Sequence, residues 1–183
     1  QQRSDEQRSM ALGELLPLAG VPGVSWLSLQ MGRSAGQLRE LAAEFPIADA
    51  CSAHRDFAET AALAATLDLV ISVDTSIAHL AGAMGIPVWV ILPQLADWRW
   101  MDEREDSPWY PTARLFRQER AGDWSVPVER MRQELQRLAA DPGAGRGVHA
   151  VSEWKPARVA GYPVPPIAEC AYVTGCGAGM GPG

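Results

Sequence analysis

The alternation of apolar and polar residues along the chain predicts strands and helices in turn. Short runs typical of strands cover residues 24–29, 47–51, 69–73, 88–92 and 113–117. Segments with apolar residues at helical spacing cover residues 10–19, 34–44, 57–67, 75–84 and 126–140. Such alternation is typical of right-handed βαβ units around a parallel sheet. We therefore predict an α/β fold, a Rossmann-like parallel sheet with flanking helices.

Residues typical of helix starts and helix ends lie between these elements and support the prediction. Asp56 precedes a helical segment as a plausible cap, and Gly85 stands where a helix often ends in a left-handed residue. The run at 69–73 is rich in β-branched residues, as in strands that are buried on both faces. Residues 93–112 form a long segment rich in Trp and acidic residues, which we expect to be an irregular loop.

The composition indicates one domain followed by a tail. The chain has 183 residues, enough for one domain with a sizeable core but short for two. From residue 142 onward Gly and Pro make up about a third of the sequence, a level typical of segments without a packed core. We expect a domain over residues 1–141 and a tail with little structure over 142–183.

Charge and cysteine content exclude several classes of protein. The net charge of -6 argues against a nucleic-acid-binding surface, which needs clustered Lys and Arg. The 3 cysteines have neither zinc-ligand nor disulfide-framework spacing. The sequence shows no apolar run of the roughly 18 residues that a membrane span needs, and its polar start does not resemble a signal peptide. We expect a cytoplasmic protein.

A polar cluster follows the apolar run at 69–73. Asp74, Thr75 and Ser76 lie where a strand gives way to a helix, and His79 lies one helical turn further on. Ligands of open parallel sheets bind at the carboxyl ends of strands, and a helix N-terminus attracts anions. Two interpretations remain open, an anion site and a well-capped turn in which the histidine is structural.

Four motifs in order resemble a known family. They are D-T-S-x-x-H at 74–79, G-I-P-V-W at 85–89, D-W-R-W at 97–100 and S-P-W-Y-P at 107–111. With these motifs in this order, the sequence resembles the C-terminal, donor-binding half of GT-B glycosyltransferases. It is most similar to the heptosyltransferase-like (family 9) domain of bacterial tetratricopeptide-repeat proteins. The resemblance covers residues 3–140.

The resemblance implies a set of residues that bind a nucleotide-sugar donor. Asp74, Thr75, Ser76 and His79 match the motif that holds the diphosphate and sugar. The other matching positions are Arg8, facing the phosphates, Gln30, bordering the nucleotide cleft, and Asp56 and Thr60, beside the base and ribose. It also implies glycosyl transfer without a metal ion or other cofactor, because helix N–H groups, hydroxyls, His and Arg can stabilise the leaving diphosphate.

The family's domain normally opens with a further strand, ahead of the segment that residues 1–9 resemble, and we expect its absence to leave a gap in the sheet. The other GT-B half, which binds a glycan or protein acceptor and supplies the general base, is also expected outside this chain. As an isolated polypeptide the chain should therefore have weak or no transferase activity.

Other interpretations remain open. The aromatic residues Trp98, Trp100, Trp109 and Tyr110 could stack on a ligand, face a second domain, or pin the loop to the core. A non-catalytic nucleotide-binding or protein-interaction module is the alternative to an enzyme. A sugar-nucleotide epimerase is a weaker option, because the carboxylate-rich motifs of those enzymes do not follow Asp74.

Overall fold

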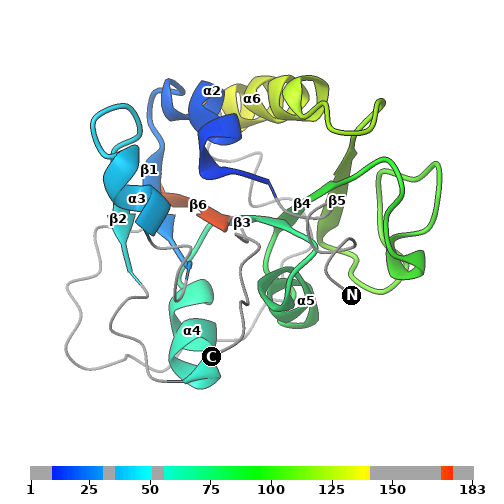
Figure 1. The fold of residues 1–183 in the computed structure, drawn as a ribbon. Helices are drawn as coiled ribbons and strands as arrows, with labels where there is room; N and C mark the ends of the chain where they lie inside the picture. The colour runs from blue at the N-terminus through cyan, green and yellow to red at the C-terminus, as the bar shows by residue number, and fades with distance from the viewer. Residues whose placement is uncertain (1–9, 31–35, 51–55, 141–169, 175–183) are drawn as a thin grey trace, which may run out of the picture.

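The computed structural model describes residues 10–30, 36–50, 56–140 and 170–174, which form a parallel sheet between helices (Figure 1). In chain order the elements are η1 (Leu12–Leu15), α2 (Leu16–Ala19), β1 (Ser25–Ser28), α3 (Gly36–Glu40), β2 (Ile47–Asp49), α4 (Phe57–Ala64), β3 (Leu69–Val73), α5 (Ser76–Ala83), β4 (Val88–Leu92), η3 (Trp98–Trp100), β5 (Ala113–Arg117), α6 (Ser125–Ala140) and β6 (Cys170–Thr174). The α/β class and the parallel sheet with flanking helices are as predicted.

The strands form one 6-stranded sheet in the order β2-β1-β6-β3-β4-β5. Every neighbouring pair is parallel. From β1 the chain proceeds outward to β2, and from β3 it proceeds outward in the opposite direction to β4 and β5. The strand order therefore reverses around β6, and such a switch point is where open α/β sheets bind ligands.

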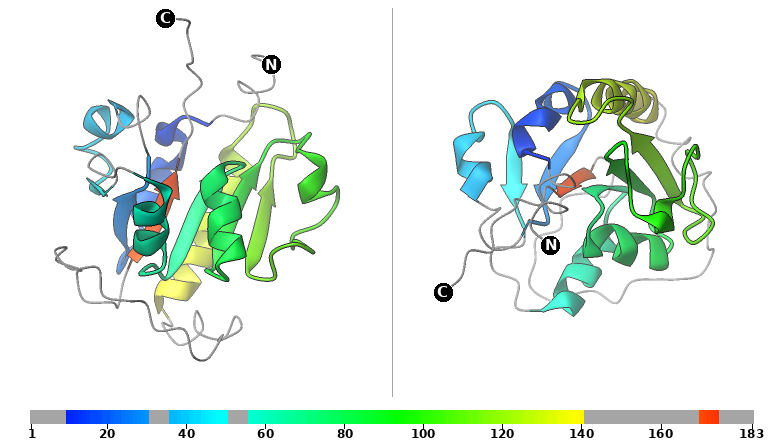
Figure 2. Two further views of the ribbon diagram at one scale, coloured as in Figure 1. Left: turned by 90° about the horizontal axis from the view of Figure 1, so that it is seen from below. Right: turned by 45° about the vertical axis from the view of Figure 1, so that its right-hand side comes forward.

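Helices cover both faces of the sheet, and each face has its own core. Helices α2 and α6 pack on one face, whereas α4 and α5 pack on the other (Figure 2). Successive residues of β3 alternate between the two cores: Leu69, Ile71 and Val73 face α6, and Val70 faces α5. All five residues of β3 are buried, as are those of β4. This explains why both strands are almost entirely apolar.

Strands β3, β4 and β5 have the predicted bounds, whereas several helices are shorter than predicted. The predicted helix 10–19 divides into η1 and α2 at Leu16, because Pro17 has no N–H to donate and its ring obstructs a continuous α-helix. Helix α4 ends at Ala64 instead of residue 67, and the Thr66 hydroxyl donates to the Leu63 carbonyl beyond that end. Gly85 has a positive φ of 71°, as expected for a helix end.

Strand β6 departs from the expectation for residues 142–183. Residues 170–174 pair with β1 on one side and β3 on the other. They occupy the interior position of the sheet where we expected a gap. The sequence C-A-Y-V-T is a short run with strand propensity, but the Gly- and Pro-rich composition around it concealed that signal.

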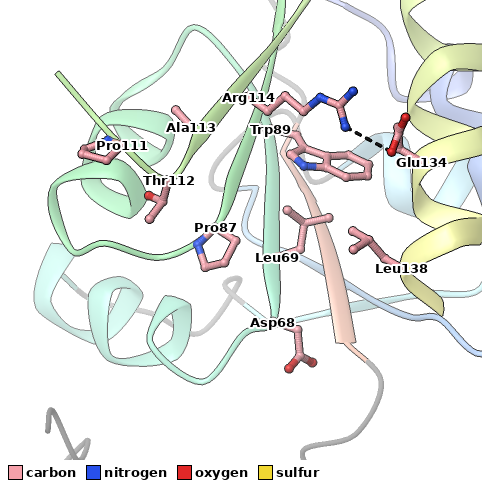
Figure 3. A pocket seen from close by; sticks show the side chains of 10 residues that line it. All are labelled: Asp68, Leu69, Pro87, Trp89, Pro111, Thr112, Ala113, Arg114, Glu134 and Leu138. Carbon is pink, nitrogen blue, oxygen red and sulfur yellow. Dashed lines mark ion pairs between the residues drawn. The ribbon is translucent and has the colours of Figure 1, made fainter. Parts of the chain in front are cut away.

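An ion pair joins α6 to the edge strand β5. Arg114 Nη1 lies 3.1 Å from Glu134 Oε2 (Figure 3). The Arg114 hydrogen bond lowers the pKa of Glu134, and nearby Arg137 and Arg130 act in the same direction, against a smaller opposing effect of burial. The negative charge of Glu134 is therefore favoured in the folded protein.

Breaking the β6 ladder is predicted to destabilise the whole sheet. Tyr172 pairs with Leu27 on β1 and with Val70 on β3. Tyr172→Pro removes a backbone donor from an interior strand, so we expect a loss of at least about 1 kcal/mol of unfolding free energy in urea. Tyr172→Phe keeps the backbone donor and is the matched control. Equal midpoints for the Pro and Phe variants would contradict the interior position of β6.

The Arg114–Glu134 ion pair is predicted to contribute pH-dependent stability. Its contribution should be complete above the ordinary Glu pKa of 4.5 and vanish as the pH falls through the lowered value in the folded state. Glu134→Gln should therefore cost roughly 0.5 kcal/mol at pH 7, because both partners are partly exposed, and less at pH 3. Urea unfolding at both pH values measures the difference, and an equal cost at both would refute it.

Candidate functional site

The predicted polar cluster lies at the carboxyl end of β3, beside the switch point. Val73 ends the strand, and α5 begins at Ser76. The Asp74 side chain is 8% exposed and that of His79 is 32% exposed, whereas Ser76 is exposed. The structure thus brings the four residues of the D-T-S-x-x-H motif together on one strand end and the first turn of one helix.

The N-terminus of α5 is not capped by the side chain of its own N-cap residue. Thr75 is its N-cap residue, but its side chain makes no cap hydrogen bond. The Thr75 hydroxyl is instead 2.9 Å from the Ser72 hydroxyl, which donates to the Val73 carbonyl. Because a hydroxyl has one proton, Thr75 is the donor to Ser72. The Thr75 side chain thus does not cap α5, whereas the Thr75 carbonyl accepts from the N–H groups of Ala78 and His79 at 3.1 and 3.4 Å.

Helix α4 on the same face provides a contrast. Its N-cap residue Asp56 accepts hydrogen bonds from the N–H groups of Ala58 and Glu59, both at 2.9 Å. A carboxylate already meets the positive end of that helix dipole. The role of Asp56 as a cap is confirmed, and of these two helices only α4 is capped by the side chain of its N-cap residue.

His79 is held by side chains from the loop between β4 and β5. Its Nδ1 is 3.0 Å from the Tyr110 hydroxyl, and its ring stacks on Trp100 with centroids 5.1 Å apart. Its Nε2 is 3.4 Å from Asp74 Oδ1, which is long for a hydrogen bond. The motif S-P-W-Y-P was visible in the sequence, but nothing in its spacing indicated that Tyr110 would reach His79.

The Trp residues of the same loop differ in burial. Trp100 is fully buried and anchors the loop to the core, whereas Trp98 and Trp109 are 68% and 57% exposed. Arg117 Nη2 donates to the carbonyl groups of Trp100 and Met101, at 3.2 and 2.7 Å. Burial lowers the pKa of Arg117, and the charge of Asp102 partly offsets this. Burial of Trp100 and the two hydrogen bonds of Arg117 therefore fix the position of the loop.

The remaining predicted residues are more scattered. Gln30 is buried just beyond β1. Like Asp74, it lies at the carboxyl ends of the strands, but on the other side of β6. Thr60 is fully buried and its hydroxyl donates to the Asp56 carbonyl at 3.3 Å, so it points along its own helix. Arg8 lies outside the described residues.

A pocket of about 200 Å³ lies at the opposite end of the strands, near their amino ends (Figure 3). Its lining includes Leu69, Pro87 and Ala113, at the amino ends of β3, β4 and β5, together with the Arg114–Glu134 pair. Parallel sheets bind ligands at the carboxyl ends of their strands, so we assign this pocket no ligand. It is a space between α6 and the sheet.

Two further properties concern only the part of the chain that the structure describes. Within it, no three side chains of His, Cys, Asp or Glu gather as a candidate metal site. None of its helices is both long enough and apolar enough to cross a bilayer.

Gly82 is predicted to be essential for docking the loop on α5. A Cβ at this position would lie 2.4 Å from Tyr110 Cγ and 2.8 Å from Tyr110 Cβ. Gly82→Ala should therefore destabilise the protein by roughly 1–3 kcal/mol, although Ala favours a helix. Gly36→Ala, where a Cβ would meet nothing within 4 Å, is the control for thermal unfolding. A Gly82→Ala variant as stable as this control would show that the loop is not packed on α5.

Comparison with known proteins finds a similarity in the part of the chain that carries this junction. Residues 28–92 match the family described as glycosyltransferase family 9 (heptosyltransferase). The matched segment contains Gln30, Asp56, Thr60 and the D-T-S-x-x-H motif. The match supports a glycosyltransferase-like function.

One curated relative matches over a longer segment. Protein FlbA of Caulobacter vibrioides is 32% identical over 128 residues, which are 68% of this chain and 21% of FlbA. The chain thus spans about a fifth of the length of that relative. No solved structure matches the chain. Residues 28–92 are therefore similar to the glycosyltransferase family 9 domain, in a chain that also resembles a part of FlbA.

Proposed function

We propose that this domain holds the diphosphate of a nucleotide-sugar donor during glycosyl transfer. The observation that carries the proposal is the N-terminus of α5 at the carboxyl end of β3, which the side chain of its own N-cap residue does not cap. It lies within the segment that matches glycosyltransferase family 9. Sequence position, helix polarity and family thus agree on one junction.

The proposed chemistry is stabilisation of a leaving group. When the glycosidic bond of the donor breaks, negative charge accumulates on the nucleoside diphosphate. Backbone N–H groups at the start of α5 and the imidazole of His79 can donate to those oxygens in a fixed arrangement, which is effective because it needs no reorganisation. In this proposal no metal ion or other cofactor takes part.

The site residues have different proposed roles. Ser76 is exposed at the first helical position and can offer its hydroxyl to the anion. Thr75 supports the turn through Ser72, and Asp74 faces His79 Nε2. Gln30 borders the same edge beyond β6, and for Asp56, Thr60 and Arg8 a contact with the nucleotide rests on the family resemblance alone.

The acceptor and the general base belong to another part of the enzyme in this proposal. The described residues at the α5 junction offer donors for a leaving group, whereas the acceptor, a glycan or protein, would approach the opposite side of the sugar. We therefore propose that transfer needs the complementary GT-B half, and that the domain binds a donor more readily than it turns one over.

An interaction module is the second candidate. Leu95, Trp98 and Trp109 are exposed on the loop between β4 and β5, with exposures of 87%, 68% and 57%. Exposed Trp residues are enriched where proteins associate. A chain that associates through these residues and binds no nucleotide would fit this candidate instead.

The donor site is predicted to bind nucleoside diphosphates measurably. Calorimetric titration of UDP, ADP and GDP should give binding at millimolar concentration or better for at least one of them. His79→Ala should weaken that binding by roughly ten- to 150-fold, since a hydrogen bond to a charged group is worth about 1.5–3 kcal/mol. Thr75→Ala should weaken it less, because the Thr75 hydroxyl supports the turn.

Arg137→Ala is the control for general charge effects. Arg137 lies in the last turn of α6 and is exposed, so its removal should leave the affinity unchanged. No binding of any of the three nucleotides at millimolar concentration would overturn the proposal. Undiminished binding after both His79→Ala and Thr75→Ala would show that the site lies elsewhere.

A further inference from the structure

The ring of His79 is fixed by three neighbours from two elements. The Tyr110 hydroxyl is 3.0 Å from Nδ1, Trp100 stacks on the ring at an interplanar angle of 19°, and Asp74 Oδ1 is 3.4 Å from Nε2. Tyr110 and Trp100 both come from the loop between β4 and β5. The histidine of the motif thus depends on residues far from it in sequence.

The neighbours also decide which nitrogen carries the proton. A carboxylate only accepts hydrogen bonds, so Asp74 favours the proton on Nε2, the nitrogen that faces it. In the neutral imidazole Nδ1 then has a lone pair, and Tyr110 is the donor to it. With the proton on Nδ1 instead, a lone pair on Nε2 would face the carboxylate.

This proton position matters for an anion. A neutral histidine can donate only from the nitrogen that carries hydrogen. With Tyr110 bound to Nδ1, the remaining N–H is on Nε2, which faces Asp74 Oδ1 at 3.4 Å. Because this distance is long for a hydrogen bond, a ligand oxygen closer to Nε2 can accept from it instead. Because the side chain of His79 is 32% exposed, a ligand at the start of α5 can reach it.

The fold holds Tyr110 firmly in this position. Its carbonyl accepts from the Ala113 N–H at 2.9 Å, which ties it to the start of β5. Its ring lies against Gly82, where any larger residue would collide with it. Thr112 donates to the Ile86 carbonyl at 2.9 Å and fixes the neighbouring turn to the segment before β4.

We infer that Tyr110 is a positioning residue of the donor site, which keeps His79 oriented with its Nε2–H available to the diphosphate. The inference rests on the proposed function for its ligand, but not for the proton position, which belongs to the unliganded protein. Tyr110 acts through His79 and need not touch the donor.

Nitrogen NMR of the imidazole rings tests the proton position. In the full chain labelled with ¹⁵N, the His79 resonances are identified by their loss in His79→Ala. We expect Nε2 to carry the proton and Nδ1 to show the shift of a hydrogen-bonded acceptor. Tyr110→Phe should move the Nδ1 resonance toward that of an unbonded nitrogen. Trp109→Phe, which removes the bond from Trp109 Nε1 to the Arg99 carbonyl in the same loop, should not.

A double-mutant cycle tests the consequence for binding. Tyr110→Phe should weaken binding of the best of UDP, ADP and GDP roughly three- to tenfold. In the His79→Ala background the same change should have little further effect, because the tyrosine acts through the histidine. A role in loop stability alone would instead weaken binding equally in both backgrounds.

The outcomes separate this inference from the proposed function. A proton on Nδ1 in the wild-type protein, or a Nδ1 resonance that Tyr110→Phe leaves in place, overturns the inference even if nucleotides bind. Equal effects of Tyr110→Phe in the two backgrounds overturn it as well. If the wild-type protein binds no nucleotide, the proposed function fails and the ligand part of the inference fails with it.

Discussion

The backbone ladder of β6 with β1 and β3 joins the two halves of the sheet. On one side β1 pairs with β2, on the other β3 pairs with β4 and β5, and β6 lies between them. Ser28 pairs with Val173 and Ser72 pairs with Thr174, so the three strands end close together along the sheet. This alignment forms the switch point and places Gln30 and Asp74 on its two sides, which is where a ligand of a parallel sheet binds.

Helices α4 and α5 both begin at the carboxyl ends of strands, and their positive N-termini have different partners. The first N–H groups of α4 donate to the carboxylate of its N-cap residue, Asp56. The hydroxyl of Thr75, the N-cap residue of α5, instead forms a hydrogen bond with the Ser72 hydroxyl. At α4 the Asp56 carboxylate stabilises the helix. A capping carboxylate at the same position of α5 would occupy the proposed anion site. His79 and its neighbours then add a donor one turn further along, held by a loop that Trp100 and Arg117 fix to the body of the domain.

Much of the fold could be predicted because local signals agree with burial. Strands β3 and β4 are buried on both faces, which requires uninterrupted apolar runs such as those that the sequence shows at 69–73 and 88–92. Strand β6 was missed because its pairing is long-range and its five residues lie within a Gly- and Pro-rich segment. In the site, the junction of Asp74 with α5 followed from strand and helix order, whereas the contact of Tyr110 with His79 depends on tertiary packing over Gly82. No local pattern encodes that contact.

The central claim is that the start of α5 receives the diphosphate of a nucleotide, and backbone amide NMR of the full chain tests it most directly. Spectra would be recorded during titration with UDP, ADP or GDP and, in parallel, with the corresponding nucleosides, which lack phosphate. The largest shifts caused only by the diphosphate should fall on the N–H groups of Ser76 and Ile77, because the N–H groups of Ala78 and His79 already donate to the Thr75 carbonyl. Shifts centred instead on the residues around Arg114 and Glu134, at the opposite edge of the sheet, would contradict the claim.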